Sequence, residues 1–180
     1  MSNDYRYELK FVLDEAGFSK ALSWMYTHTN MKKAHPSRIV NTVYFDDPGY
    51  SSVRENLAGI SNRKKTRLRW YQLKADKQTV MSPALEIKSR DGRLGKKDHF
   101  LLPNIKKDLL NIEYRELFQN IRQHLKNDIT FDDHYSPTLH VNYNREYYED
   151  YRGVRLTFDR SISFINPLPH LLINGSIPVS

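Results

Sequence analysis

The sequence feature that most constrains the fold is the stretch Lys65-Thr66-Arg67-Leu68-Arg69-Trp70-Tyr71, in which a cation alternates with an apolar or small residue. Such alternation is typical of a β-strand with one buried face. Successive side chains of a strand point to opposite faces, so Lys65, Arg67 and Arg69 share one face, and Leu68 and Trp70 share the other. The stretch therefore predicts a strand with one cationic face and one apolar face.

Four other segments have strand-like spacing with charge on a single side-chain parity, and the first of them predicts a strand from Arg6 to Phe11. Together they contain Lys10, Glu8, Glu86, Lys88, Arg145 and Arg155. Cations about 6.6 Å apart along a strand repel one another unless an anion or a carboxylate lies between them. An open sheet would turn the charged faces to solvent and cover the apolar faces with helices. A closed barrel would turn the charged faces inward. The alternation alone does not choose between these two architectures.

Composition limits the partners. The chain of 180 residues carries a formal charge of +7, which favours a polyanion such as nucleic acid, polyphosphate, a nucleotide or an acidic membrane surface. It has no cysteine, which excludes disulfides and thiolate chemistry and is compatible with a cytoplasmic location. No signal-peptide pattern and no apolar run of about 18 residues is present, so we expect no membrane span in this chain. The length favours one domain.

Two segments have helical periodicity. Asp14 is a candidate N-cap for a helix whose apolar face carries Phe18, Ala21, Leu22 and Met25. A second helical pattern covers residues 106–126. The turn dipeptide Asp91-Gly92 joins two strands, and the proline-bearing tail after residue 166 predicts a loop with no further strand.

Six short motifs occur in the order seen in VTC domains, which the chain resembles from residue 5 to about residue 165. They are Tyr5 to Lys10, Asn41 to Asp46, Lys65 to Tyr71, Leu85 to Lys88, Tyr143 to Arg145 and Arg155 to Asp159. VTC domains are the catalytic domains of the vacuolar transporter chaperone complex and of its bacterial relatives, within the CYTH-like triphosphate tunnel metalloenzymes. The resemblance implies an α+β, mainly β fold: an antiparallel β-barrel tunnel with basic residues and a few glutamates inside and helices packed outside.

The resemblance also implies an activity, polyphosphate synthesis, in which the γ-phosphoryl group of ATP moves to a growing chain with Mn²⁺ or Mg²⁺. Catalysis of such a transfer consists mainly of positioning and charge neutralisation. In this interpretation Arg67, Arg69 and Lys88 are the catalytic cations. Substrate phosphates would be bound by Lys10, Lys65, Arg67, Arg69, Lys88, Arg145 and Arg155. Glu8 and Glu86 would hold the metal with its waters, or orient the lysines.

Two features depart from the patterns of these families. Tunnel triphosphatases open with Glu-x-Glu-x-Lys, whereas Arg6 stands here at the first acidic position, as VTC-type sequences also tend to show. VTC domains end with a strand bearing a further Glu-x-Lys pattern, and residues 1–180 do not contain it. We therefore expect a single VTC-like tunnel domain over residues 1–180, truncated at its C-terminus and incomplete at its last strand.

Three alternatives stay open. The same basic bore would also suit a non-catalytic module that binds polyphosphate or another polyanion without turnover. A tunnel triphosphatase would release orthophosphate and form no polymer. Nucleic-acid binding follows from charge and from aromatic residues such as Trp70, but the cations alternate with core residues where a stacking platform needs exposed aromatics. The sequence leaves a membrane-associated partner possible.

Overall fold

The structure is a computed structural model, and it describes residues 8–77, 79–92, 94–102, 105, 109, 112–125, 134–167, 173 and 178–179. The chain forms two compact units. Unit 1 comprises Met1–His35 and Tyr147–Leu156, and unit 2 comprises Pro36–Glu146 and Thr157–Ser180.

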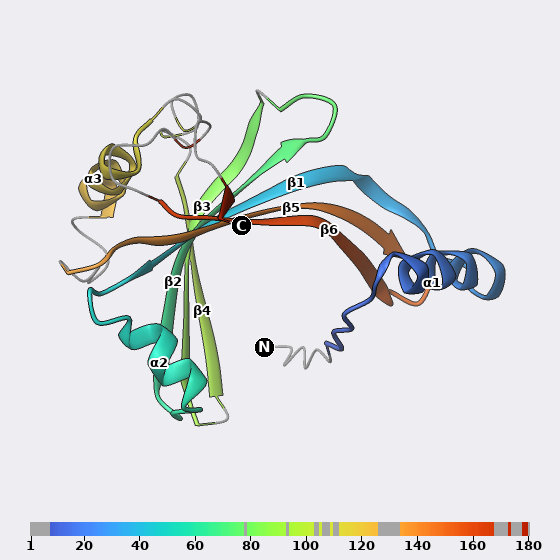
Figure 1. The fold of residues 1–180 in the computed structure, drawn as a ribbon, viewed down its shortest axis with the longest axis horizontal. Coiled ribbons are helices and arrows are strands. Elements are labelled where there is room, and N and C mark those ends of the chain that lie inside the picture. The colour runs from blue at the N-terminus through green and yellow to red at the C-terminus, as the bar shows by residue number, and fades with distance from the viewer. Residues whose placement is uncertain are drawn as a thin grey trace. The chain divides into compact units, whose positions relative to one another are not determined.

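The described residues form three α-helices and seven strands (Figure 1). The helices are α1 (Glu15–His28), α2 (Ser51–Leu57) and α3 (Tyr114–Leu125). The strands are β1 (Lys32–Asp46), β2 (Arg63–Leu73), β3 (Val80–Asp91), β4 (Leu94–Leu101), β5 (Ser136–Glu149), β6 (Arg155–Ile165) and β7 (Pro178–Val179). The fold is thus α+β and mainly β, as the sequence predicts.

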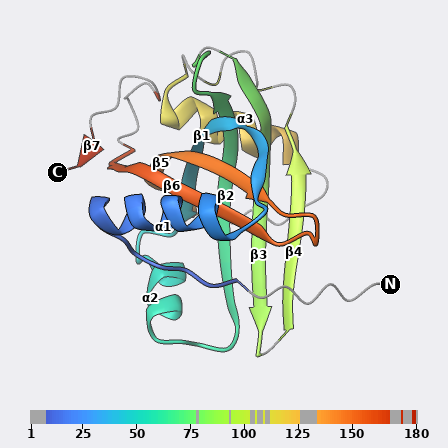
Figure 2. The same ribbon diagram turned by 90° about the vertical axis from the view of Figure 1, so that its right-hand side faces the viewer.

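All seven strands belong to one sheet, in the order β4-β3-β2-β1-β5-β6-β7. The pairs β1 with β2, β2 with β3, β3 with β4 and β6 with β7 are antiparallel. Figure 2 shows β2, β3 and β4 side by side. In the part of the chain that the structure describes, β4 and β7 are the two edges, so the sheet is open and the expected closure into a barrel is not seen.

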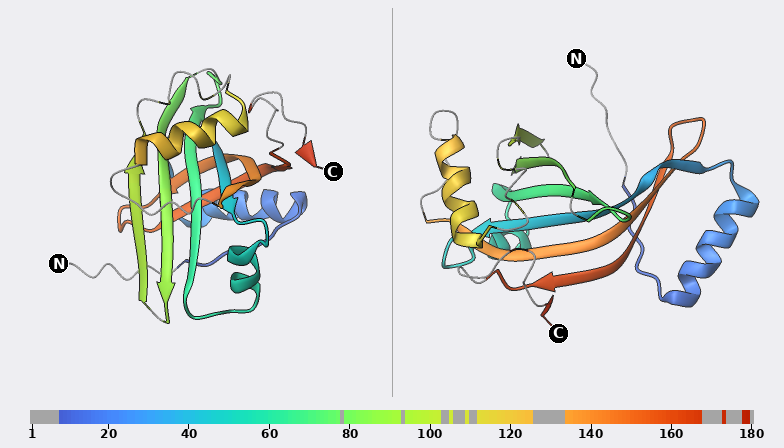
Figure 3. Two further views of the ribbon diagram at one scale, coloured as in Figure 1. Left: turned by 90° about the vertical axis from the view of Figure 1, so that its left-hand side faces the viewer. Right: turned by 90° about the horizontal axis from the view of Figure 1, so that it is seen from above.

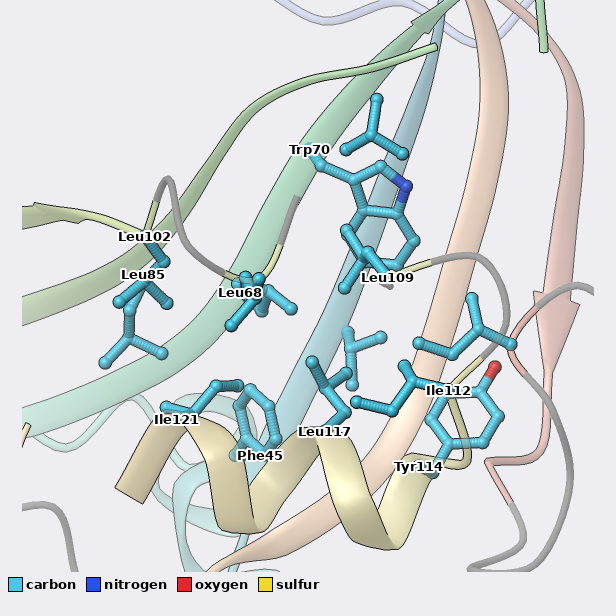
Figure 4. Packing of buried hydrophobic residues seen from close by; sticks show 14 of the residues in the cluster. Phe45, Leu68, Trp70, Leu85, Leu102, Leu109, Ile112, Tyr114, Leu117 and Ile121 are labelled. Atoms are coloured by element: carbon cyan, nitrogen blue, oxygen red, sulfur yellow. The ribbon is translucent and has the colours of Figure 1, made fainter. Parts of the chain in front are cut away.

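The core of unit 2 lies on one face of this sheet. The alternating burial of β2 places Leu68 and Trp70 in the core, beside Val43 and Phe45 of β1 and Leu85 of β3. Helix α3 covers this face across the strands, as the left view of Figure 3 shows. Its buried residues Tyr114, Leu117 and Ile121 pack against the strand residues (Figure 4). The apolar parity predicted for β2 is therefore confirmed.

A chain of polar side chains crosses the core of unit 2. The Tyr114 hydroxyl donates a hydrogen bond of 2.6 Å to Nδ1 of His140, a buried residue of β5. Nε2 of His140 lies 3.3 Å from the Asn41 side-chain oxygen. That same oxygen accepts a hydrogen bond of 2.7 Å from Asn142, and the Asn41 amide donates to Gln72 at 2.7 Å. Because the Asn41 oxygen is an acceptor, the His140 ring carries its proton on Nε2. Burial lowers the pKa of His140 to about 4.

Unit 1 contains α1, which begins as the sequence predicts. The Asp14 carboxylate caps the helix by accepting the Gly17 amide at 2.7 Å, and Met25 is fully buried. The Tyr26 and Tyr148 hydroxyls lie 3.3 Å apart and join α1 to the part of β5 that belongs to this unit.

Three expectations for local structure are wrong. The pattern from Arg6 to Phe11 forms no strand in its described part, residues 8–11: side chains of both parities are exposed there, among them Glu8 and Leu9, and no strand is assigned. Arg6 and Tyr7 lie outside the described residues. Of the helix predicted over residues 106–126, the described part is α3 from Tyr114 onward, whereas Leu109 and Ile112 reach the core from non-helical positions; residues 106–108, 110–111 and 126 lie outside the described residues. The tail is not all loop, since Pro178 and Val179 pair with β6.

Candidate functional site

The cationic parity of β2 lies on the sheet face opposite the core. Antiparallel pairing brings Lys65 opposite Lys88 and Arg67 opposite Glu86 on β3. The register of β4 places Lys97 opposite Lys88 and His99 opposite Glu86. On the other side of β2, Thr42 and Tyr44 of β1 lie opposite Arg69 and Arg67. We call this surface the basic face and define it by Thr42, Tyr44, Lys65, Arg67, Arg69, Glu86, Lys88, Lys97, His99, Tyr143, Arg145 and Asp159.

Three lysines form a row across the basic face. Lys65, Lys88 and Lys97 occupy directly opposed positions on β2, β3 and β4. Like charges in directly opposed positions destabilise a sheet. Burial and then the neighbouring cations Arg63, Lys88 and Arg67 lower the pKa of Lys65, although Tyr44 opposes this effect. Within the described residues, no carboxylate forms an ion pair with Lys65 or Lys88, so the row has positive charge that an anion would neutralise.

Glu86 is the carboxylate at the centre of these cations, and its side chain is 6% exposed. Arg67 donates Nε to Oε2 at 2.7 Å, its Nη2 lies 2.7 Å from the same oxygen in the ion pair, and the Lys97 ammonium lies 2.7 Å from Oε1. Burial would raise the pKa of Glu86, but the Lys97 hydrogen bond, Arg67 and Arg69 outweigh it and lower that pKa to about 2. Glu86 is therefore ionised and orients both Arg67 and Lys97.

The two arginines of β2 have different partners. Burial would lower the pKa of Arg67, but Glu86 and a hydrogen bond with Tyr44 raise it. Arg69 donates Nε to the Thr42 hydroxyl at 3.2 Å, a neutral partner that leaves its charge uncompensated by that contact. On β2 to β4 the basic face thus has five cations, Lys65, Arg67, Arg69, Lys88 and Lys97, against the single carboxylate Glu86.

Arg145 and Asp159 extend the basic face onto β5 and β6. Arg145 donates Nε to Oδ1 of Asp159 at 2.6 Å and Nη2 to Oδ2 at 2.7 Å. Its guanidinium carbon also lies 5.1 Å from the Tyr143 ring centroid. Burial raises the pKa of Tyr143, whereas Arg145 and Arg69 lower it, so this ring lies within the field of both arginines.

The structure brings together most of the residues that the sequence singles out. Lys65, Arg67, Arg69, Glu86, Lys88 and Arg145 all lie on the basic face of unit 2. Lys10, Glu8 and Arg155 belong to unit 1. There Lys10 and Glu8 are both exposed and 3.6 Å apart, and Arg155 is 3.5 Å from Glu149.

Sequence reasoning missed Lys97, His99, Tyr44, Tyr143 and Asp159 as members of the site. The strand parity of β4 would have offered either Lys96 or Lys97, and only the register with β3 selects Lys97. Asp159 has the same strand parity as Arg155, which the sequence does single out. Its ion pair with Arg145 joins two strands, β5 and β6, and parity within one strand does not predict it.

The described residues do not fit a protein-held metal site. No group of three or more His, Cys, Asp or Glu side chains converges in the part of the chain that the structure describes. Both oxygens of Glu86 are engaged by cations, which a metal ion would have to displace. Glu8 is an exposed residue of unit 1. We therefore assign no metal-dependent step to these residues.

A separate surface pocket lies in unit 1, lined among others by Lys32, Lys33, Glu149 and Asp150. Its charges are mixed, and it contains none of the residues that the sequence singles out. The basic face of unit 2, with its concentrated positive charge, is the better candidate for anion chemistry.

The order of the motifs and the basic face that they build agree with one family. The model of the VTC domain matches residues 5–176, nearly the whole chain. The chain belongs to the VTC domain family. A comparison with curated proteins finds no match. Among the described helices of this VTC domain, none has the length and apolar character needed to cross a membrane.

Proposed function

We propose that this VTC domain binds ATP and polyphosphate on its basic face and transfers the γ-phosphoryl group of ATP to a growing polyphosphate chain. The observation that carries the proposal is the row of Lys65, Lys88 and Lys97 beside Arg67 and Arg69. Two of the three lysines of this row have no described carboxylate partner, and a chain of closely spaced phosphates supplies the missing negative charge. Membership in the VTC family supports the same substrate class.

In the proposed reaction a terminal oxygen of the polyphosphate chain attacks the γ-phosphorus of ATP. The bond from that phosphorus to the bridging oxygen breaks, and ADP leaves with the negative charge that develops on that oxygen. Arg67 and Arg69 suit the phosphate oxygens because a guanidinium group donates two parallel hydrogen bonds, whereas Lys65 and Lys88 act as point charges. These cations lower the barrier by neutralising charge on the transferred group and on the leaving oxygen.

In this scheme Glu86 acts by positioning Arg67 and Lys97. By fixing Arg67 and Lys97, it keeps two donors in place before the substrate arrives, which reduces the entropy that binding costs. We propose that Mn²⁺ or Mg²⁺ enters as part of the ATP complex, because magnesium is commonly bound through substrate phosphates. The tunnel architecture of the family remains part of the proposal, and so do the phosphate-binding role of Lys10 and Arg155 and the metal-binding role of Glu8.

A second candidate is a polyanion-binding module without turnover. The observation that favours it is the engagement of both Glu86 oxygens by Arg67 and Lys97, which leaves the basic face cationic without a converging set of metal ligands among the described residues. Nucleic acid is the weaker partner, because the Trp70 ring is fully buried in the core and cannot stack on bases.

The experiment is incubation with ATP and Mn²⁺, with gel detection of polyphosphate and a parallel orthophosphate assay. Arg69→Ala removes a cation of the basic face, and Lys64→Ala removes a cation of the same strand with the opposite parity. Polymer from the wild type and from Lys64→Ala, but not from Arg69→Ala, supports the polymerase. Orthophosphate without polymer indicates a triphosphatase. Polyphosphate binding that Arg69→Ala weakens, with no turnover, indicates the binding module.

A further inference from the structure

We propose that Asp159 is an internal counter-ion that occupies Arg145 and thereby limits how tightly the basic face holds a polyphosphate chain. This inference rests on the proposed polyphosphate site and adds a residue that controls its affinity. The Asp159 carboxylate accepts the hydrogen bonds of the Arg145 guanidinium that a bound phosphate would accept.

The geometry of the pair carries the proposal. Arg145 donates two parallel hydrogen bonds, from Nε and Nη2, to the two oxygens of one carboxylate, at 2.6 and 2.7 Å. This is also the arrangement in which guanidinium groups bind phosphate. A phosphate that takes this edge of Arg145 must displace Asp159, so part of the binding energy is spent on breaking the ion pair.

The pair differs from the one between Glu86 and Arg67. The Glu86 side chain is 6% exposed and is held by Lys97 as well as by Arg67, so a phosphate that displaced it would break two ion pairs of a buried carboxylate. The Asp159 side chain is 32% exposed and the Arg145 side chain 25%. Water can therefore solvate the Asp159 carboxylate once a phosphate replaces it, which makes this exchange the easier one.

Tyr143 keeps Arg145 in place without Asp159. The guanidinium carbon lies 5.1 Å from the Tyr143 ring centroid, within the range of a cation–π contact. Loss of the Asp159 charge should therefore free the hydrogen-bonding edge of Arg145 for anions and still leave the side chain on the basic face.

The position of the pair predicts a dependence on chain length. Arg69 lies on β2 and Arg145 on β5, with β1 between them, so two strand spacings of about 4.8 Å separate their strands. A pyrophosphate bound among the cations of β2 to β4 need not reach Arg145, whereas a longer chain can extend to it. Asp159 should therefore weaken the binding of long chains more than the binding of short ones.

The experiment measures the affinity of the whole chain for sodium polyphosphate and for pyrophosphate by calorimetry, without divalent metal, over a series of salt concentrations. For Asp159→Asn we expect polyphosphate to bind about twofold to fivefold more tightly, the range for a partly exposed ion pair. The affinity for pyrophosphate should change less than twofold. The slope of log affinity against log salt should steepen by up to about one, because Arg145 then releases a counter-ion.

Asp98→Asn is the matched control. Asp98 forms an ion pair with Lys96 at 2.9 Å and has a 30% exposed side chain, so it resembles Asp159 in pairing and exposure. It lies opposite Ile87, a buried core residue, and therefore on the other parity of β4 from the basic face. The net charge of the chain changes by the same amount, and we expect no specific gain in affinity beyond that of the wild type.

The double variant Arg145→Gln with Asp159→Asn should return the affinity to within about twofold of the wild type, because both charges of the pair are then absent. Asp159→Ser, which is also uncharged, is the second variant if Asp159→Asn lowers the Tm. Equal or weaker polyphosphate binding in either folded variant overturns the inference, and so does a gain in affinity that survives loss of Arg145.

The two proposals fail differently. If wild-type protein binds polyphosphate and Arg69→Ala weakens it, the binding site stands, and the Asp159 variants alone decide the inference. If wild-type protein does not bind polyphosphate, or Arg69→Ala binds as the wild type does, the proposed site on the basic face is wrong, and the role of Asp159 fails with it.

Discussion

Arg67 directs both Nε and Nη2 at one oxygen of Glu86, Oε2, each at 2.7 Å. The other oxygen is thereby left to Lys97 at 2.7 Å. One buried carboxylate on β3 thus links cations from β2 and β4, the strands on either side of it. The ion pairs therefore stabilise the sheet while they also position two cations of the candidate site.

Substitution Glu86→Gln should destabilise the fold by about 1 to 3 kcal/mol at pH 7, because charged hydrogen bonds to Arg67 and Lys97 are lost. The pKa of Glu86 is lowered to about 2 in the folded state, from 4.5. Its contribution to stability is therefore complete above about pH 4.5 and is lost as the pH falls through 2. Urea unfolding at several pH values checks this. A stability difference from the wild type that stays constant down to pH 2 would contradict the assignment.

His140 predicts a second pH dependence. Burial lowers its pKa from 6.5 to about 4, so the unfolded chain takes up a proton at higher pH than the folded chain does. The free energy of unfolding should therefore fall as the pH drops from about 6.5 to about 4, by roughly 3 kcal/mol in total.

The measurement is urea unfolding of the wild type and of His140→Gln between pH 4 and 7. The variant should lack this part of the pH dependence, whatever its stability at pH 7. His28→Gln, at the exposed C-terminal end of α1, should retain it. Identical pH profiles for the wild type and His140→Gln would show that the buried histidine does not account for the effect.

Leu68→Ala should destabilise unit 2 by about 2 to 5 kcal/mol, because Leu68 is fully buried at the centre of the core. Leu94→Ala removes the same atoms from a side chain that is 78% exposed, and should change stability by no more than about 0.5 kcal/mol. Thermal unfolding of both variants provides the comparison. Similar effects of the two substitutions would argue against the assigned parity of β2.

The cap of α1 allows a test in unit 1. Asp14→Ala removes the carboxylate that accepts the Gly17 amide at 2.7 Å, and should cost about 0.5 to 2 kcal/mol of helix stability. Amide hydrogen exchange in the first turn of α1 should become faster, while exchange at Leu68 in unit 2 stays unchanged. Unaltered exchange at Gly17 would mean that the cap contributes little.

The sequence predicts best what depends on local periodicity. The alternation around Leu68 and Trp70 correctly gives the two faces of β2, and the Asp91-Gly92 turn correctly joins β3 to β4. The strand expected before residue 12 fails in the described part because a strand needs a hydrogen-bonded neighbour, which parity does not provide. Leu109 and Ile112 show the same limit, since apolar spacing does not distinguish a helix from a loop that packs on the core.

The same limit applies to the candidate site: local alternation predicts some of its residues, and the alignment of the strands decides the others. The alternation of residue types is sufficient to predict that Arg67 and Arg69 share one face of β2. The choice of Lys97 over Lys96 depends on register across the turn, and the pairing of Arg145 with Asp159 depends on how β5 and β6 align. The closure of the sheet and the functional roles of Lys10, Glu8 and Arg155 stay predictions.

Because the side chains of β2 alternate between two faces, a single register determines both which of them enter the core and which lie in the candidate site. A single residue inserted in the middle of Arg63–Leu73 would move every side chain beyond it to the opposite face. Arg69 would then enter the core in place of Trp70, while the apolar side chains would replace the cations on the basic face. The strand should therefore tolerate substitutions that keep the alternation but no change in length, and a lineage of such domains should vary in length in its loops and not in this strand.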